Sequence, residues 1–175
     1  MHYSSKSPIN IISIFSIIGW VALMISPWMI QFGMSSSPVT PLHRVLQFFA
    51  YWFLHGGLWH ILSNVFFFLV IGKTVEVIHG NRYIWLLWWW TTLFVGVILM
   101  YYSDAFTIGA SGFAMALLVV YTIDLYKWRR WEYKTALLLL AINIAIGFDG
   151  NISLLGHLFG AIAGAIFTLF PIKSR

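Results

Sequence analysis

Four polar side chains that suit acyl transfer lie in otherwise apolar stretches of the chain: Ser111, His157, His60 and Asn64. A serine hydroxyl becomes an effective nucleophile when a base removes its proton, and neutral histidine suits that task near pH 7. The negative charge that develops on the attacked carbonyl oxygen needs hydrogen-bond donors aimed at it. We therefore predict Ser111 as nucleophile and His157 as general base. The donors would be the Asn64 amide, the His60 ring and the backbone N–H of Ser111.

These residues belong to a chain whose composition suits lipid. Hydrophobic residues make up 61% of the 175 residues and charged residues only 9%, whereas soluble domains carry roughly 25% charged residues. This excludes a soluble enzyme, a DNA-binding domain and a disordered linker. The chain has no cysteine, which excludes disulfides, thiolate catalysis and Cys-ligated metal centres.

Six apolar stretches approach or exceed the roughly 20 residues that a membrane-spanning helix needs. They cover residues 9–32, 59–78, 83–102, 110–126, 135–148 and 152–170. The fourth and fifth are short, so we expect helices that begin below the membrane surface beside a water-filled depression. The first is too long for a signal core and is interpreted as a retained anchor. The sequence thus predicts an all-α integral membrane protein, a six-transmembrane-helix bundle forming a single domain over residues 1–175.

The basic residues predict the orientation, because cytoplasmic loops of membrane proteins are rich in Lys and Arg. With the N-terminus inside, only Arg44 lies outside, and nine basic residues lie at the cytoplasmic face: Lys6, Lys73, Arg82, Lys127, Arg129, Arg130, Lys134, Lys173 and Arg175. Both termini are therefore predicted to be cytoplasmic. The segment 127–134 is interpreted as an interfacial loop facing anionic lipid, so the net charge of +5 requires no nucleic-acid partner.

The four candidate residues share one depth in this arrangement. His60 and Asn64 are four residues apart and so lie on one helical face, while Ser111 and His157 lie near the starts of the fourth and sixth stretches. At 1.5 Å per residue, all four lie within about 10 Å of the outer surface. Each residue alone has an ordinary alternative, such as a hydrogen bond within or between helices. Their common depth favours a shared site.

Small residues follow two of these side chains at helical spacing. Gly112-x-x-x-Ala116 follows Ser111, and Gly160-x-x-x-Gly164 follows His157. Such pairs let helix backbones approach closely, which would bring the serine and histidine together. Glu76 and Asp124 lie about 20 Å or more further along their helices, so we predict a Ser–His dyad without an orienting carboxylate from either.

The connection between the first two stretches is long. Residues 35–41 are polar turn material, whereas residues 47–54 are too aromatic for a solvated loop. Aromatic rings are favoured at the membrane interface. We expect this second half to lie there.

Together these motifs resemble those of the rhomboid intramembrane serine proteases: His55-x-x-x-x-His60-x-x-x-Asn64, Gly109-x-Ser111-Gly112, His157-x-x-Gly160-x-x-x-Gly164 and Gly72-Lys-Thr-Val-Glu76. The resemblance implies Ser111 as nucleophile, His157 as base, and His60 with Asn64 in the oxyanion hole. It also implies a membrane-embedded first loop, a fifth span that gates access, transmembrane protein substrates and no cofactor. A minimal six-span, multi-pass protein of a bacterial plasma membrane is the corresponding expectation.

Two positions depart from the family pattern. Many members carry Trp-Arg where this chain has Leu46-Gln47, so its first loop is expected to be anchored differently. Many also carry a tyrosine where this chain has Met115. Methionine fills the space and can contact a ring, but it would hold the imidazole less rigidly.

Three other functions compete with proteolysis. A rhomboid-like protein could bind transmembrane helices without cutting them, although inactive relatives generally lose the serine or the histidine. A small transporter would carry ionisable residues near the bilayer centre. A metal site of His55, His60 and His157 is disfavoured, because His55 and His60 lie on different helical faces with no carboxylate nearby. The sequence specifies neither the substrate nor the oligomeric state.

Overall fold

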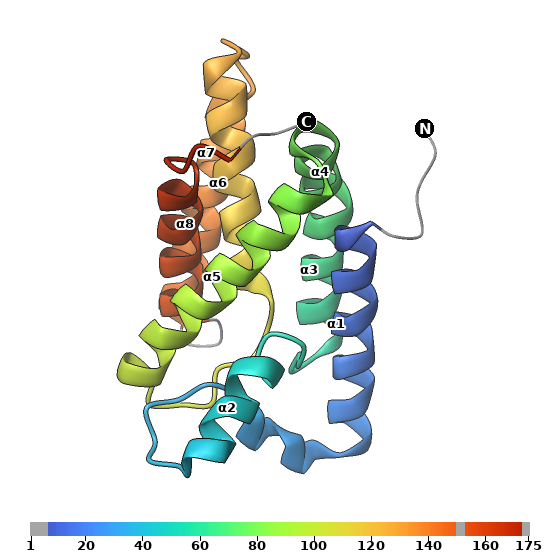
Figure 1. The fold of residues 1–175 in the computed structure, drawn as a ribbon, viewed down its shortest axis with the longest axis vertical. Helices are drawn as coiled ribbons and strands as arrows, with labels where there is room; N and C mark the ends of the chain where they lie inside the picture. Colours follow the sequence, from blue (N-terminus) through green and yellow to red (C-terminus); the bar gives the residue numbers. More distant parts are fainter. Residues whose placement is uncertain (1–6, 150–152, 173–175) are drawn as a thin grey trace.

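The computed structural model describes residues 7–149 and 153–172, and within them the chain is helical and forms no named strand (Figure 1). The α-helices, listed in chain order, are α1 (Pro8–Ile25), α2 (Pro41–Ala50), α3 (Leu58–Phe67), α4 (Lys73–His79), α5 (Asn81–Tyr102), α6 (Ser111–Lys127), α7 (Tyr133–Ile146) and α8 (Leu154–Phe167). Shorter helical segments are the 3-10 turns η1 (Pro27–Phe32) and η3 (Gly147–Asp149) and the π-helical segment η2 (Phe68–Gly72), which joins α3 to α4.

Each predicted span coincides with helical structure. Three helical stretches are long and apolar enough to cross a membrane: Pro8–Ile25, Leu58–His79 and Asn81–Tyr102. The helices α6, α7 and α8 are shorter, with 17, 14 and 14 residues. The chain is thus a helical bundle of membrane character, and the count of six crossings stays a prediction.

The first predicted span is interrupted. We expected one apolar stretch over residues 9–32, but α1 ends at Ile25 and a 3-10 turn begins at Pro27. Proline disfavours the α conformation at the residue before it, and Ser26 adopts φ −131° and ψ 78°. Hydropathy alone does not detect this break because apolar residues continue after it, at Trp28, Met29, Ile30 and Phe32.

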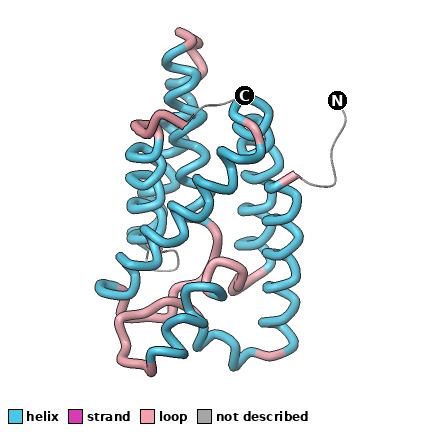
Figure 2. The backbone as a smooth tube through the Cα atoms, in the orientation of Figure 1, coloured by secondary structure: helices cyan, strands magenta, loops and turns pink. Residues whose placement is uncertain are grey.

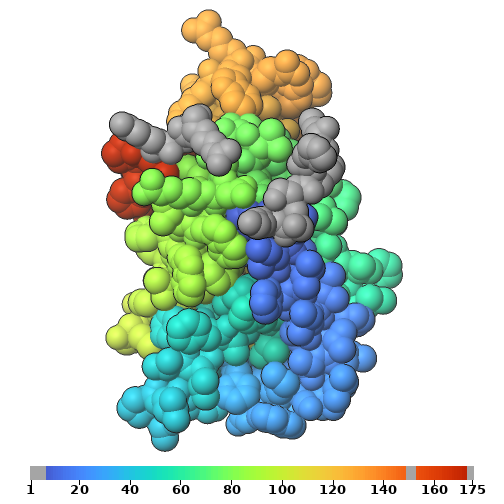
Figure 3. Space-filling view, turned by 45° about the vertical axis from the view of Figure 1, so that its right-hand side comes forward, coloured from blue at the N-terminus to red at the C-terminus, as the bar shows by residue number. Residues whose placement is uncertain are grey.

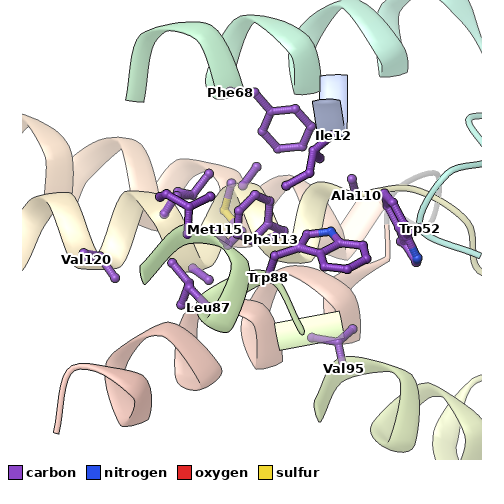
Figure 4. Packing of buried hydrophobic residues seen from close by; sticks show 14 of the residues in the cluster. Ile12, Trp52, Phe68, Leu87, Trp88, Val95, Ala110, Phe113, Met115 and Val120 are labelled. Atoms are coloured by element: carbon purple, nitrogen blue, oxygen red, sulfur yellow. The ribbon is translucent and has the colours of Figure 1, made fainter. Parts of the chain in front are cut away.

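The helix α6 lies at the centre of the bundle, with α5, α7 and α8 beside it (Figure 1). All residues from Gly112 to Val120 are buried, as expected for a helix that is hydrophobic on every side. Figure 4 shows Ile12 and Phe68 pointing toward Phe113 in the core, and the rings of Phe68 and Phe113 are 5.7 Å apart. Ser111, at the start of α6, is therefore mounted on a fully packed helix.

The helices α6 and α8 meet through the small residues that the sequence singled out. A Cβ atom on Gly160 would collide with the backbone of Gly112, and one on Gly164 would lie 2.7 Å from the backbone of Ala116. The two backbones therefore approach as closely as the absence of side chains permits.

The long connections gather at the end of the bundle that carries α2 (Figure 2). An isolated antiparallel bridge joins Met34 to Thr107 and so ties the α1–α2 connection to the loop before α6. Toward the opposite end lie the start of α1 and the end of α8, and the turn between α6 and α7 projects beyond both (Figure 1).

The α2 segment is held from within by Arg44 and Gln47. The Arg44 guanidinium donates to the carbonyls of Ser35 and Ser37 at 2.5 and 2.7 Å, and to Gln47 Oε1 at 2.8 Å. The Gln47 amide in turn donates to the carbonyl of Gln31. At the positions where Leu46-Gln47 replaces the family's Trp-Arg, the segment is therefore anchored by Gln47 together with Arg44, three residues before it. Their hydrogen bonds join α2 to the residues that precede it.

In the aromatic half of the same segment, some side chains are buried in the protein and others are exposed. Gln47, Tyr51, Trp52 and Leu54 are buried, whereas Phe49 is exposed. The rings of Trp52 and Trp88 lie 4.3 Å apart. Much of the aromatic character that suggested a lipid interface therefore serves packing against α5.

We expect Gly160→Ala to lower the free energy of unfolding by about 1–3 kcal/mol, because the added methyl group would force α6 and α8 apart. Chemical unfolding in detergent micelles measures this change. Gly56→Ala is the matched control, since its Cβ would meet Ile108 at an ordinary 3.7 Å. Equal stability of the two variants would contradict the close crossing.

Candidate active site

Ser111 opens α6, and the turn before it sets its position. Gly109 has φ +118°, a backbone conformation that L side chains rarely adopt. Its N–H donates to the carbonyl of Tyr51 at 2.8 Å. Because Ser111 is the first residue of the helix, its backbone N–H has no acceptor within α6. Ser111 therefore places both its hydroxyl and a backbone N–H without an intrahelical acceptor at the start of α6.

His60 packs directly on that turn. A Cβ atom at Gly109 would lie 2.6 Å from both Cε1 and Nε2 of the His60 ring. Glycine is thus required at position 109 for two reasons, its positive φ and the ring against it. The ring nitrogen lies beside the backbone two residues before Ser111, as the predicted grouping of His60 with Ser111 requires.

His55 holds the same turn from the other side. Its Nδ1–H donates to the carbonyl of Phe53 at 2.8 Å, and its Nε2 accepts the N–H of Ala110 at 3.4 Å. Its ring is 4.8 Å from that of His60. Sequence analysis gave His55 no catalytic role. The structure makes it a positioning residue for the Gly109–Ser111 turn, for which the His55-x-x-x-x-His60 spacing was the only signal.

Asn64 lies one helical turn beyond His60 and is 3% exposed. Its Nδ2 has no hydrogen-bond partner among the described residues. Buried donors without partners are rare in folded proteins because losing water without replacement costs about 1–3 kcal/mol. An amide held in this state can donate to an oxygen brought in by a substrate.

His157 is oriented by a backbone carbonyl. Its helix, α8, is capped by Ser153, whose side chain accepts the N–H of Gly156. The ring Nδ1 of His157 is 2.7 Å from the carbonyl oxygen of Asn143 in α7. A carbonyl oxygen can only accept, so Nδ1 carries the proton and Nε2 keeps its lone pair. This is the tautomer that a general base needs.

The sequence could not identify this orienting group. Every residue has a carbonyl, so the contribution of Asn143 has no signature in residue type. The two carboxylates considered at the sequence level are engaged at the other end of the bundle. Glu76 accepts from Ser7 at 2.8 Å, and Asp124 pairs with His79 at 2.7 Å.

The α6–α8 crossing brings the two dyad residues to the same place. A Cβ on Gly112, next to Ser111, would lie 3.1 Å from the carbonyl oxygen of Gly156, next to His157. Ser111 and His157, both among the described residues, share no hydrogen bond. Catalytic hydrogen bonds are often long without substrate.

Met115 is fully buried beneath Ser111 in the core of α6. Figure 4 shows it beside Phe113, between α6 and its neighbours. The effect of this methionine on the His157 imidazole stays a prediction.

A small cavity of about 20 Å³ adjoins Ser111 and is lined by Gly109, Gly112, Thr91, Trp88 and residues around them. Thr91 Oγ1 and Trp88 Nε1 are buried without hydrogen-bond partners in the described part of the chain. A cavity of this size with polar groups on its wall can hold one water molecule.

No three His, Cys, Asp or Glu side chains within residues 7–149 and 153–172 are grouped as ligands of a metal ion would be. The arrangement of Ser111, His157, His60 and Asn64 instead offers a hydroxyl, a base and several hydrogen-bond donors. Its chemistry is that of acyl transfer without a metal ligand set.

Comparison with known proteins identifies the family. The model of the rhomboid domain matches residues 42–174, which is about three quarters of the chain. The chain belongs to the rhomboid family.

Several relatives share this rhomboid domain. RHOMBOID-like protein 1 of Arabidopsis thaliana is 31% identical over 73% of the chain and 35% of its own length, and Rhomboid-related protein 1 of Caenorhabditis elegans is 31% identical over 69% and 38%. Rhomboid-like protease 1 of Toxoplasma gondii is 22% identical over 93% of the chain and 63% of its own length. The chain thus spans between about a third and two thirds of these relatives.

We expect acid to destabilise the protein partly through His55. Burial, together with the nearby His60, lowers the pKa of His55 from 6.5 to about 4. The native ring stays neutral while the unfolded chain takes up a proton near pH 6.5, so stability falls as pH drops from 6.5 toward 4.

The measurement is the unfolding free energy of the wild type and of His55→Gln across this pH range. Glutamine cannot titrate, and its amide oxygen can still accept from Ala110. The wild type should lose up to about 1.4 kcal/mol more per pH unit than the variant. Parallel pH profiles would contradict a buried neutral His55.

Proposed function

We propose that this rhomboid is an intramembrane serine endopeptidase that cleaves membrane-anchored proteins through a Ser111–His157 dyad. The observation that carries the proposal is the fixed tautomer of His157, whose Nδ1–H donates to Asn143 and leaves Nε2 free. In a chain composed for lipid, a histidine held this way beside a helix that starts with serine favours general-base catalysis over packing alone.

The reaction would proceed in two acyl transfers. His157 Nε2 takes the proton of Ser111 Oγ, which attacks the scissile carbonyl carbon, and the oxygen that becomes negative accepts hydrogen bonds from Asn64 Nδ2 and the Ser111 N–H. The protonated His157 then gives its proton to the leaving amine. Water, activated by the same imidazole, hydrolyses the acyl-enzyme. The cavity beside Thr91 and Ser111 offers a place for that water.

His60 completes this proposal as a donor from the opposite wall of the site. Its ring lies against Gly109, so a ring N–H can reach an oxygen bound at the start of α6. The glycines at 109, 112, 160 and 164 serve as the framework that lets these backbones approach.

The proposed topology puts both termini in the cytoplasm and cleavage near the outer leaflet. The charge distribution described above supports this, because the basic α6–α7 turn lies at the opposite end of α6 from Ser111. Transmembrane protein segments are the proposed substrates, and the plasma membrane of a bacterium is the proposed location.

We expect a fluorescent fluorophosphonate to label the detergent-solubilised wild type, and labelling to be lost in Ser111→Ala and in His157→Ala. The reagent reacts with serines whose hydroxyl is activated by a base. Ser63→Ala is the matched control, because Ser63 is exposed and bonds only to its own helix. Persistent labelling of the Ser111→Ala variant would refute the assignment of Ser111 as the nucleophile.

A well-folded wild type that resists labelling, yet retains transmembrane peptides in a pull-down, would favour a rhomboid that binds helices without cleaving them. In that event Met115→Tyr tests whether the methionine leaves the imidazole too loosely held. Restored labelling in this variant would preserve the proposed dyad.

Removing one oxyanion donor should slow catalysis without disabling the nucleophile. We expect Asn64→Ala to reduce the rate of cleavage of a transmembrane reporter by about 10²–10³-fold. Thermal unfolding of the variant separates the loss of the donor from any loss of stability caused by the smaller side chain. An unchanged cleavage rate would exclude Asn64 from the oxyanion hole.

A further inference from the structure

The turn between α6 and α7, residues 126–134, projects beyond the rest of the bundle (Figure 3). It contains four basic residues and one acidic residue. Arg130 pairs with Glu132 at 2.8 Å. Lys127, Arg129 and Lys134 are exposed and form no salt bridge within the described part of the chain. The turn therefore presents uncompensated positive charge.

Arg129 occupies a backbone conformation that favours glycine. Its φ is +55°, the only positive φ of a non-glycine residue in the described ranges. The N–H of Arg129 donates to the carbonyl of Tyr126, and that of Arg130 to the carbonyl of Leu125. These two bonds form the usual helix-ending motif in which glycine is preferred. Glycine would adopt this backbone without strain, so Arg129 stands here at a conformational cost.

A cavity of about 480 Å³ opens beside this arginine, lined by Tyr126, Lys127, Arg129 and Tyr133. Its volume lies in the range of small-ligand sites, about 300–1,000 Å³. The Tyr126 and Tyr133 rings meet edge to face at 5.4 Å and so join the ends of the two helices. Two basic and two tyrosine residues thus line one hollow, and basic side chains with hydroxyl groups suit the binding of a phosphate group.

The cavity lies at the depth of lipid headgroups. The 17 residues of α6 carry the chain about 24 Å from Ser111 to Lys127 at 1.5 Å per residue. With Ser111 about 10 Å below one surface, Lys127 lies just beyond the opposite face of a hydrocarbon core about 30 Å thick. Trp128 and Trp131, which flank the hollow in sequence, are exposed, as is typical of side chains at a membrane interface.

We propose that the hollow between α6 and α7 binds the headgroup phosphate of an anionic phospholipid in the leaflet opposite the candidate active site. Arg129 and Lys127 contact the phosphate, the tyrosines close the walls, and the tryptophans lie among neighbouring lipids. The site would attach the α7 end of the bundle to the membrane surface. It is independent of the proposed peptidase activity and does not require Ser111 to react.

The test measures the thermal unfolding of the full chain in neutral detergent micelles, titrated with phosphatidylglycerol or with phosphatidylcholine. The variants are Arg129→Gly, which removes the charge and suits the backbone, and Arg82→Gln, which removes one exposed charge at the start of α5. Soluble glycerol phosphate and an acidic peptide are added in separate titrations.

We expect phosphatidylglycerol, and not phosphatidylcholine, to raise the unfolding midpoint of the wild type and of Arg82→Gln. Arg129→Gly should bind phosphatidylglycerol about fivefold more weakly, the effect of one basic side chain near an anionic surface. Without lipid this variant should be at least as stable as wild type, because glycine relieves the strained backbone.

Equal titrations of the wild type and Arg129→Gly would overturn the proposal, as would equal stabilisation by phosphatidylcholine. Stabilisation by glycerol phosphate alone, at the same concentrations as the lipid, would show that no membrane lipid is needed. Stabilisation by the acidic peptide equal to that by the lipid would assign the surface to a protein partner.

Discussion

The close approach of α6 and α8 is the constraint on which the rest of the site depends. In lipid no hydrophobic force drives one apolar helix onto another, so association relies on tight van der Waals packing and hydrogen bonds. The backbones of Gly112 and Gly160 meet where any side chain would intervene. This contact sets the distance between the helix that carries Ser111 and the helix that carries His157.

Because of the same crossing, the loops determine the position of the first turn of α6. Because α6 is buried along most of its length, its first turn can be adjusted only from the loop end of the bundle. There the Tyr51 carbonyl accepts the N–H of Gly109, and the His55 ring accepts that of Ala110. The Cε1 and Nε2 atoms of His60 lie against Gly109. The Arg44–Gln47 bonds hold the segment that supplies them. The geometry of the candidate site therefore depends on the connection between α1 and α3 as much as on the long helices.

Sequence analysis predicted the helical character, the positions of the apolar segments and the small-residue contact, because these follow from hydropathy and from residue size. The roles of Ser111, His157, His60 and Asn64 stay predictions, now with a geometry that supports them. What the sequence could not supply were contributions from the backbone. The carbonyl of Asn143 that orients His157 and the break of α1 before Pro27 depend on local conformation. For His55, spacing gave a hint, but only the contact with Ala110 gave it a role.

The π-helical segment between Phe68 and Gly72 separates two surfaces of one continuous helix. Above it, α3 presents His60 and Asn64 to the loop end, and below it α4 presents Glu76 and Lys73 to Ser7. Each residue of a helix turns the chain by about 100°, and a π turn inserts one extra residue into that rhythm. Deletion of one apolar residue here would leave the hydropathy of the span almost unchanged, yet it would rotate one surface away from its partners. The direction in which each side chain points around this helix therefore depends on the π turn, and a hydropathy plot does not show it.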